Sequence, residues 1–247
     1  MPPHHDWETT PIPLIPTPYH LTRAPDQYTS AASDLALLHN TLIRALNSIY
    51  IQAPHVPVPQ YANFVKYSLA AHAALTAHTR FEQALFSPEP EHAPAEPGLV
   101  DATDGEQRRG FVVGVAAWGN WLRSIGERKN NFSGDMCVAL MDDFVASVAR
   151  HFRDGVEMVR VGEKKRVVAA RKREIGRFLG GLGKRSVLPV VCLNHDDDFE
   201  GGWHGFPPVP AVVRWVWRNF GRLDAEVWGF SCVGFDGKAR ALRYGGE

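Results

Sequence analysis

The chain has 247 residues, of which 45% are hydrophobic and 22% are charged, as in an ordinary globular protein with a sizeable core. Its 27 basic and 27 acidic residues cancel, so we expect no general electrostatic attraction to nucleic acid or to an anionic membrane. The cysteines, Cys137, Cys192 and Cys232, are widely spaced and odd in number, which argues against a disulfide framework and for a reducing compartment.

Two further features of the sequence concern membranes and secretion. No run of 18 or more apolar residues occurs, so no membrane span is predicted. The first residues show no basic stretch followed by an apolar one, so no secretory signal is predicted. We expect a cytoplasmic protein.

Residues 1–30 are the first of three predicted parts, a proline-rich N-terminal arm. The prolines between residues 11 and 18 favour an extended chain that cannot enter a helix interior. We expect Leu14, Ile15 and Tyr19 to pack this arm against the rest of the protein.

Residues 31–161, the second part, contain four segments in which apolar residues recur every three or four positions. They predict helices from an N-cap at Ser33 to about Tyr50, and over about 60–86, 104–125 and 134–161. In the third helix, the expected inward row is Phe111, Val112, Val115, Gly119 and Leu122. Short connections between four such helices predict an all-α fold, an up-down-up-down four-helix bundle.

Residues 162–247, the third part, differ in composition and are expected to pack on the bundle. A basic stretch over 163–185 has one apolar side and predicts a helix with a solvated face. An aromatic segment predicts a short helix near 209–220, and the glycines around 234–237 allow a hairpin.

Four polar residues lie in the apolar stripes of three predicted helices. His39 belongs to the first helix, His78 and Glu82 to the second, and His151 to the fourth. His78 and Glu82 are four positions apart, so both emerge from one helix face. Imidazole and carboxylate groups that converge from facing helices suit iron, zinc or manganese. Asp154 follows His151 by three positions and is a weaker candidate for the same site.

Several motifs accompany these residues in a fixed order: Leu38-His39-Asn40, Leu46-Asn47-Ser48-Ile49-Tyr50, Gln52-Ala53-Pro54, His78-x-x-x-Glu82, Leu85-Phe86, Glu106-Gln107, His151-Phe152-Arg153-Asp154, Leu188-Pro189, Asn194-His195-Asp196 and Phe206-Pro207-Pro208. Over residues 33–245 this order resembles the hemerythrin-like (HHE cation-binding) family, in particular its fungal branch. Members of that family hold a non-heme di-iron centre through five histidines and two bridging carboxylates, and the centre binds or reacts with oxygen. The resemblance implies that His39 and His78 serve one iron, that Glu82 bridges, and that His151 serves the other.

The chain departs from the family pattern at the second iron. The third helix of the family supplies two histidines four positions apart, and the matching residues here are Arg108 and Val112. No shift of the alignment restores them, because no histidine lies between His92 and His151. Gly155 occupies the place expected for the second bridging carboxylate. A di-iron site is therefore not expected.

Two alternatives remain for the site. His39, His78 and Glu82 can hold a single iron, or another divalent metal, with open coordination positions. Alternatively, the guanidinium of Arg108 replaces the metal beside Glu82, because a buried carboxylate is costly without a cation.

Two classes of function follow from these alternatives. The first is a metal-free or single-metal scaffold or binding protein with a degenerate site, whose partner is an unidentified small molecule or protein. The second is an oxygen-dependent oxidative enzyme that uses one His/His/Glu iron on a small metabolite, in secondary metabolism.

Overall fold

The computed structural model describes residues 10–24, 26–86, 102–161, 175, 177–202, 205–207 and 209–245, with the side chains of 83–86 and 102–109 outside the description. The fold is all-α, as predicted, and the described residues contain no β-strand. The α-helices are α1 Pro18–Thr22, α2 Gln27–Gln52, α3 Tyr61–Phe86, α4 Ala102–Gly126, α5 Gly134–Arg160, α7 Leu188–Cys192, α8 Ala211–Phe220 and α9 Ala225–Trp228. Short 3-10 helices lie at η2 Ala53–His55, η3 Val58–Gln60, η4 Phe199–Gly201 and η5 Gly221–Asp224.

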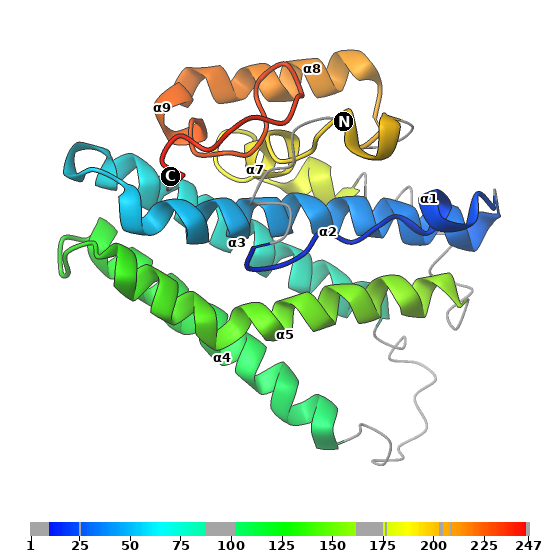
Figure 1. Cartoon of the computed structure of the whole chain (residues 1–247), viewed down its shortest axis with the longest axis horizontal. Coiled ribbons are helices and arrows are strands. Elements are labelled where there is room, and N and C mark those ends of the chain that lie inside the picture. The colour runs from blue at the N-terminus through cyan, green and yellow to red at the C-terminus, as the bar shows by residue number, and fades with distance from the viewer. Residues whose placement is uncertain are drawn as a thin grey trace.

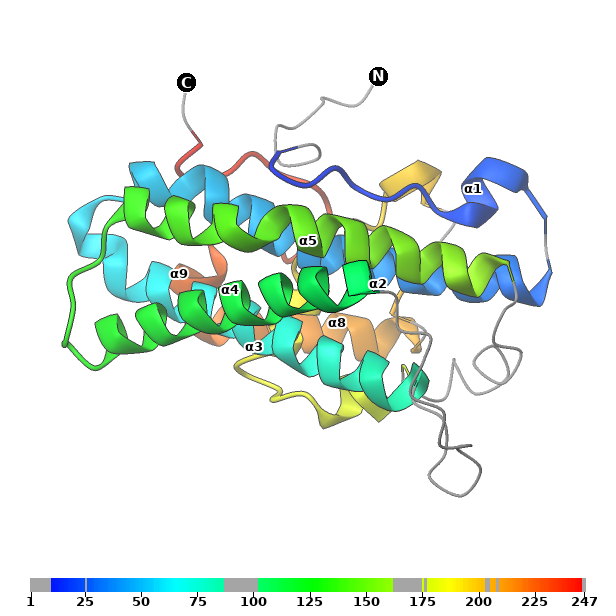
Figure 2. The same cartoon turned by 90° about the horizontal axis from the view of Figure 1, so that it is seen from below.

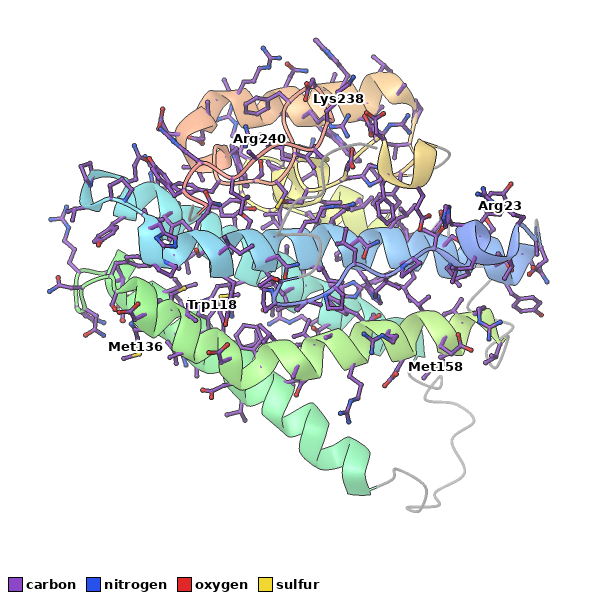
Figure 3. The ribbon with its side chains drawn as sticks, viewed as in Figure 1. Arg23, Trp118, Met136, Met158, Lys238 and Arg240 are labelled. Atoms are coloured by element: carbon purple, nitrogen blue, oxygen red, sulfur yellow. The ribbon has the colours of Figure 1, made fainter. Side chains whose placement is uncertain are left out.

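The four long helices contact one another in a closed ring. Helix α2 packs against α3 and α5, and α4 packs against the same two helices (Figures 1 and 2). The side chains inside this ring are those of the predicted stripes, including Phe64, Met141 and Phe144. Trp118 of α4 is also fully buried, with its ring 5.7 Å from that of Phe144 (Figure 3).

Helix α2 begins seven residues earlier than predicted. Asp26 is the N-cap, because its carboxylate accepts hydrogen bonds from the backbone N–H groups of Tyr28 and Thr29 at 2.8 and 3.0 Å. The predicted cap at Ser33 is wrong: Ser33 is buried within the helix, donates to the carbonyl of Thr29 and accepts from the N–H of Tyr19. A serine inside a helix can make such local bonds and so imitate a cap signal.

The prediction for Val112 is also wrong. Val112 is 48% exposed, whereas Phe111 and Val115 are buried. The inward row of α4 therefore runs through Phe111, Val115, Trp118 and Leu122, with steps of four, three and four residues.

The N-terminal arm is held on α2 by two asparagines seven residues apart. The amide of Asn47 accepts from the N–H of Ile12 at 3.1 Å and donates to its carbonyl at 2.7 Å. Asn40 makes the same pair of bonds with Ile15, both at 2.8 Å. Each asparagine satisfies one extended residue completely, so the arm is bound as a strand would be. Ile12 and Ile15 are consequently buried in the core.

The C-terminal segment covers the side of α2 and α3 that faces away from α5 (Figure 1). Within this segment, Arg218 of α8 points inward and joins α8 to the end of α7 and the residues that follow it. Its Nη1 and Nη2 donate to Asp197 at 2.6 and 2.8 Å, and its Nε and Nη2 donate to the carbonyls of Cys192 and His195. The predicted short helix is α8. The expected hairpin is reduced to a turn closed by a single bridge between Val233 and Ala239.

The basic helix predicted over 163–185 lies mostly outside the described residues, which show helix only at 175 and 177–181 there. Among the helices of the described residues, none combines the length and the apolar character needed to cross a membrane.

Candidate metal centre

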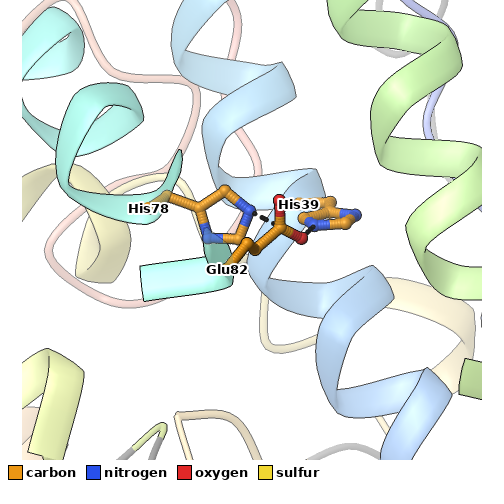
Figure 4. A group of neighbouring side chains, drawn as sticks. All are labelled: His39, His78 and Glu82. Atoms are coloured by element: carbon orange, nitrogen blue, oxygen red, sulfur yellow. Dashed lines mark hydrogen bonds and ion pairs between the residues drawn. The ribbon is translucent and has the colours of Figure 1, made fainter. Parts of the chain in front are cut away.

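Three helices bring the predicted polar residues together in the core. His39 comes from α2, His78 and Glu82 come from successive turns of α3, and His151 comes from α5. The ring nitrogens of His39 and His78 and a carboxylate oxygen of Glu82 all lie within 4.8 Å of one another, and all three residues are buried (Figure 4). The group can therefore hold a metal ion, in the region where the sequence places it.

Glu82 is the centre of the cluster. Its Oε1 lies 3.1 Å from Nε2 of His39 and 3.3 Å from Nε2 of His78. Its Oε2 lies 2.7 Å from Nε2 of His151. Two ligand atoms that are each about 2.1 Å from one ion, at angles of about 90–109°, lie roughly 3.0–3.4 Å apart. The spacings of Oε1 from the first two imidazoles fall in this range.

The orientation of His39 is fixed from α5. Its Nδ1 lies 3.0 Å from the backbone carbonyl of Phe152. A carbonyl oxygen only accepts, so Nδ1 carries the proton and donates it. Its ring also stacks on that of Phe152, with centroids 4.2 Å apart. A histidine that donates one N–H to a carbonyl and turns its other nitrogen inward is the arrangement usual for metal ligands.

This orientation creates a conflict that a cation would resolve. Burial lowers the pKa of His39 to about 4, against an opposing effect of its hydrogen bond with Glu82, so the imidazole is neutral at pH 7. A neutral imidazole with its proton on Nδ1 presents a lone pair at Nε2. That lone pair faces Oε1 of Glu82 at 3.1 Å. The contact is therefore favourable only with a cation at Nε2, either a proton shared with Glu82 or a metal ion.

The charge state of Glu82 has the same implication. Burial alone would raise the pKa of Glu82, but the charge of His78 and the hydrogen bond from His151 hold it well below its usual range. The carboxylate is thus ionised in the core. Among the residues that the structure describes, neither buried ring nitrogen of His78 has a hydrogen-bond partner, although Nε2 lies 3.3 Å from Oε1 of Glu82. A metal ion at this point would accept the lone pair of a His78 ring nitrogen and would balance the charge of the Glu82 carboxylate.

The structure places Gly155 directly against the cluster. A Cβ atom on residue 155 would lie 3.5 Å from Cε1 of His39 and 3.6 Å from Oε1 of Glu82. A carboxylate at this position would therefore reach the centre, and glycine removes it. Asp154, by contrast, is exposed and does not join the cluster. It lines a groove of about 420 Å³ between α5 and the N-terminal arm.

Helix α4 contributes an aromatic ring beside the cluster. Phe111 stacks on His151, with centroids 5.4 Å apart and planes 25° from parallel. The exposed Val112 does not face the cluster. The side chain of Arg108 lies outside the described residues, so its predicted role beside Glu82 stays a prediction.

Sequence reasoning missed two contributions to this region. Phe152 acts through its backbone carbonyl, which no residue type reveals. Asn40 and Asn47 hold the arm beside His39. Their spacing of seven residues within a buried stripe indicates two buried amides that need polar partners.

Comparison with known proteins gives one relative of similar length. It is the dimeric xanthone biosynthesis cluster protein R11 of Cryptosporiopsis sp. (strain 8999), 24% identical over 251 residues, with 98% of this chain and 94% of the relative covered. No protein-family model and no solved structure matches the chain. The similarity extends over the arm, the long helices and the C-terminal segment alike.

Proposed function

We propose that this chain is a hemerythrin-like four-helix-bundle protein that has lost the di-iron centre and binds a single divalent metal ion. The ligands are His39, His78 and Glu82. The observation that carries the proposal is that His39, His78 and Glu82, all buried, each turn one possible ligand atom to a common point, within 4.8 Å of one another. The closed ring of four helices supports the bundle.

The proposal also covers which metal the site holds and how the chain is divided into parts. Two imidazoles and one carboxylate suit iron, zinc or manganese, and the resemblance favours iron. When bound in this way, Fe(II) keeps open coordination positions at which dioxygen chemistry can occur. We divide the chain into an N-terminal arm (1–30), the bundle (31–161) and a C-terminal extension (162–247).

The burial of the site favours a binding or scaffold role over catalysis on a large substrate. The side chains of His39 and His78 are fully buried, and that of Glu82 is 4% exposed. In an enzyme the substrate must reach the ion. The groove between α5 and the N-terminal arm does not open onto the site, because His39, His78 and Glu82 are not among its lining residues. The ion would then tie α2 to α3 and stabilise the fold.

A second candidate is an oxygen-dependent oxidative enzyme of secondary metabolism. It is favoured by the relative, whose name places it in a dimeric xanthone biosynthesis cluster. A chromosomal Glu82→Gln allele separates the two candidates. An enzyme predicts that this allele accumulates the same precursor as a gene deletion, whereas a scaffold that tolerates metal loss predicts a product profile close to wild type.

The metal site is tested by titrating metal-free protein with Co(II) and following its visible absorption. We expect saturation at one equivalent, and no saturable signal in Glu82→Gln. His72→Gln is the matched control, because His72 lies on the same helix and is only half-buried. Absence of a specific signal in the wild-type protein would overturn the proposal.

A further inference from the structure

The two carboxylate oxygens of Glu82 have different partners. Oε1 lies 3.1 Å from Nε2 of His39 and 3.3 Å from Nε2 of His78, and these three atoms form the candidate ligand set. Oε2 faces His151 at 2.7 Å, the shortest contact in the cluster. That distance is typical of a hydrogen bond to a charged acceptor, so Nε2–H of His151 donates to Oε2 and fixes the rotation of the carboxylate.

Exposure also separates His151 from the other three residues. Its side chain is 41% exposed, against 4% for Glu82 and 0% for His39 and His78. Of these four side chains, His151 is therefore the one that reaches solvent. An ion that enters or leaves past this residue requires the imidazole to turn away from Oε2.

Phe111 stacks on the imidazole of His151 while it is hydrogen-bonded to Glu82. The two rings are nearly parallel, 25° apart, with their centroids 5.4 Å from each other. Phe111 is itself buried in the row of α4 that faces the interior. The stack ties the orientation of His151 to α4, a helix that supplies no histidine to the cluster.

We propose that His151 is a hinged cover of the ion site and a positioning residue for Glu82, and is not a ligand of the ion. Loading and release of the ion then require His151 to swing out from between Glu82 and Phe111. The inference rests on the proposed single-metal function for the identity of what passes the cover. The cover itself is a property of the protein chain.

The first test measures ion release. Co(II)-loaded wild type, His151→Ala and Phe111→Ala are mixed with excess chelator, and the dissociation rate and Kd are determined separately. Because aromatic stacking is modest, Phe111→Ala should raise the release rate by a factor of roughly 2–10. Its Kd should stay within about threefold, since entry and release both become faster.

His151→Ala should release the ion faster still. Its Kd should rise about tenfold, as expected when a hydrogen-bond partner of a ligand is removed. Its Co(II) band positions should not change. Changed bands would identify His151 as a ligand and overturn the proposal, as would release rates equal to wild type in both variants.

The second test needs no metal. Diethyl pyrocarbonate is applied to the folded, metal-free proteins, and labelled histidines are located by mass spectrometry. Exposed His55 is the internal standard. In the wild type we expect label on His55 and His151 and little on His39 or His78. Both variants should label His39 and His78 faster by a factor of roughly 2–10, the increase in opening that loss of the stack allows.

The two tests fail in different ways. If the wild type binds no Co(II), the proposed function fails, and the labelling still decides whether His151 is a cover. Labelling of His39 and His78 at the wild-type rate in both variants, with circular dichroism unchanged, would overturn the cover. Equal labelling of all four histidines in the wild type would also overturn it.

Discussion

His39 donates its Nδ1–H to the backbone carbonyl of Phe152, 3.0 Å away, so a main-chain atom of α5 sets the direction of a side chain on α2. The consequence is that Nε2 of His39 points at Oε1 of Glu82. The geometry of the cluster therefore depends on how α2, α3 and α5 pack together. The same packing would be reinforced by an ion held between α2 and α3.

Removal of the Glu82 charge should destabilise the metal-free protein. Glu82→Gln removes the charge that faces His78 and weakens the hydrogen bond from His151, and we expect a loss of about 1–3 kcal/mol in the free energy of unfolding. Urea denaturation measures the loss. Glu157→Gln is the control, because Glu157 is exposed and pairs with Arg160 on the helix surface, and it should cost at most about 1 kcal/mol. Equal effects of the two variants would contradict the central place of Glu82.

Replacement of Gly155 should change stability in a way that depends on the new side chain and, for aspartate, on whether metal is bound. Gly155→Ala places a methyl group at ordinary contact distance from His39 and Glu82, so it should stabilise by roughly 0.5–1 kcal/mol through helix propensity. Gly155→Asp adds a second carboxylate beside Glu82. We expect it to lower the Tm of the metal-free protein and to show a larger rise in Tm with Zn(II) than Gly155→Ala. A Zn(II) response equal in the two variants would argue against a site at this point.

Acid should destabilise the metal-free protein through His39. The pKa of His39 is about 4 when folded, below the value of about 6.5 expected in the unfolded chain. The unfolded state therefore binds the extra proton between these values, and stability falls as pH falls from 6.5 towards 4. The loss is on the order of 3 kcal/mol when complete. Glu82 acts in the same direction, because its lowered pKa gives stability that disappears as the carboxylate is protonated.

The pH effect is checked by urea denaturation between pH 7 and pH 4. His39→Gln removes the titrating group and should show a shallower slope over this range. A slope as steep as that of the wild type would assign the effect to other residues.

The arm should depend on its asparagine clamps. Asn47→Ala leaves the buried N–H and carbonyl of Ile12 without partners, and we expect a loss of about 1–3 kcal/mol. Asn47→Asp keeps the acceptor but loses the donor and adds a buried charge, so it should cost at least as much. The exposed Asn120 is the control, and Asn120→Ala should stay within about 0.5 kcal/mol. Hydrogen exchange at Ile12 should accelerate in the Asn47 variants alone.

The sequence predicted the long helices well because their stripes are regular. His78 and Glu82 share the heptad rows of Phe64 and Leu75, and all four are buried as expected. Val112 and Phe111 are adjacent apolar residues, and composition alone does not decide which of them turns inward. Tertiary packing against His151 selects Phe111.

Other features depend on contacts distant in the chain. Asp26 begins α2, while Ser33 is used to bind the arm at Tyr19, and local signals favour either residue as the cap. The hydrogen bond between His39 and Phe152 spans 113 positions and involves a backbone atom. No periodicity in the sequence encodes it. The candidate ligands were therefore predictable, whereas the orientation that makes them a candidate site was not.

The most direct test of the account is the metal content of the purified protein. Wild-type chain and Glu82→Gln are produced with iron, zinc and manganese supplied, and metal per chain is determined by plasma mass spectrometry. We predict one metal ion per wild-type chain and none in Glu82→Gln. Two irons per wild-type chain, or a wild-type protein that takes up no metal, would contradict the account.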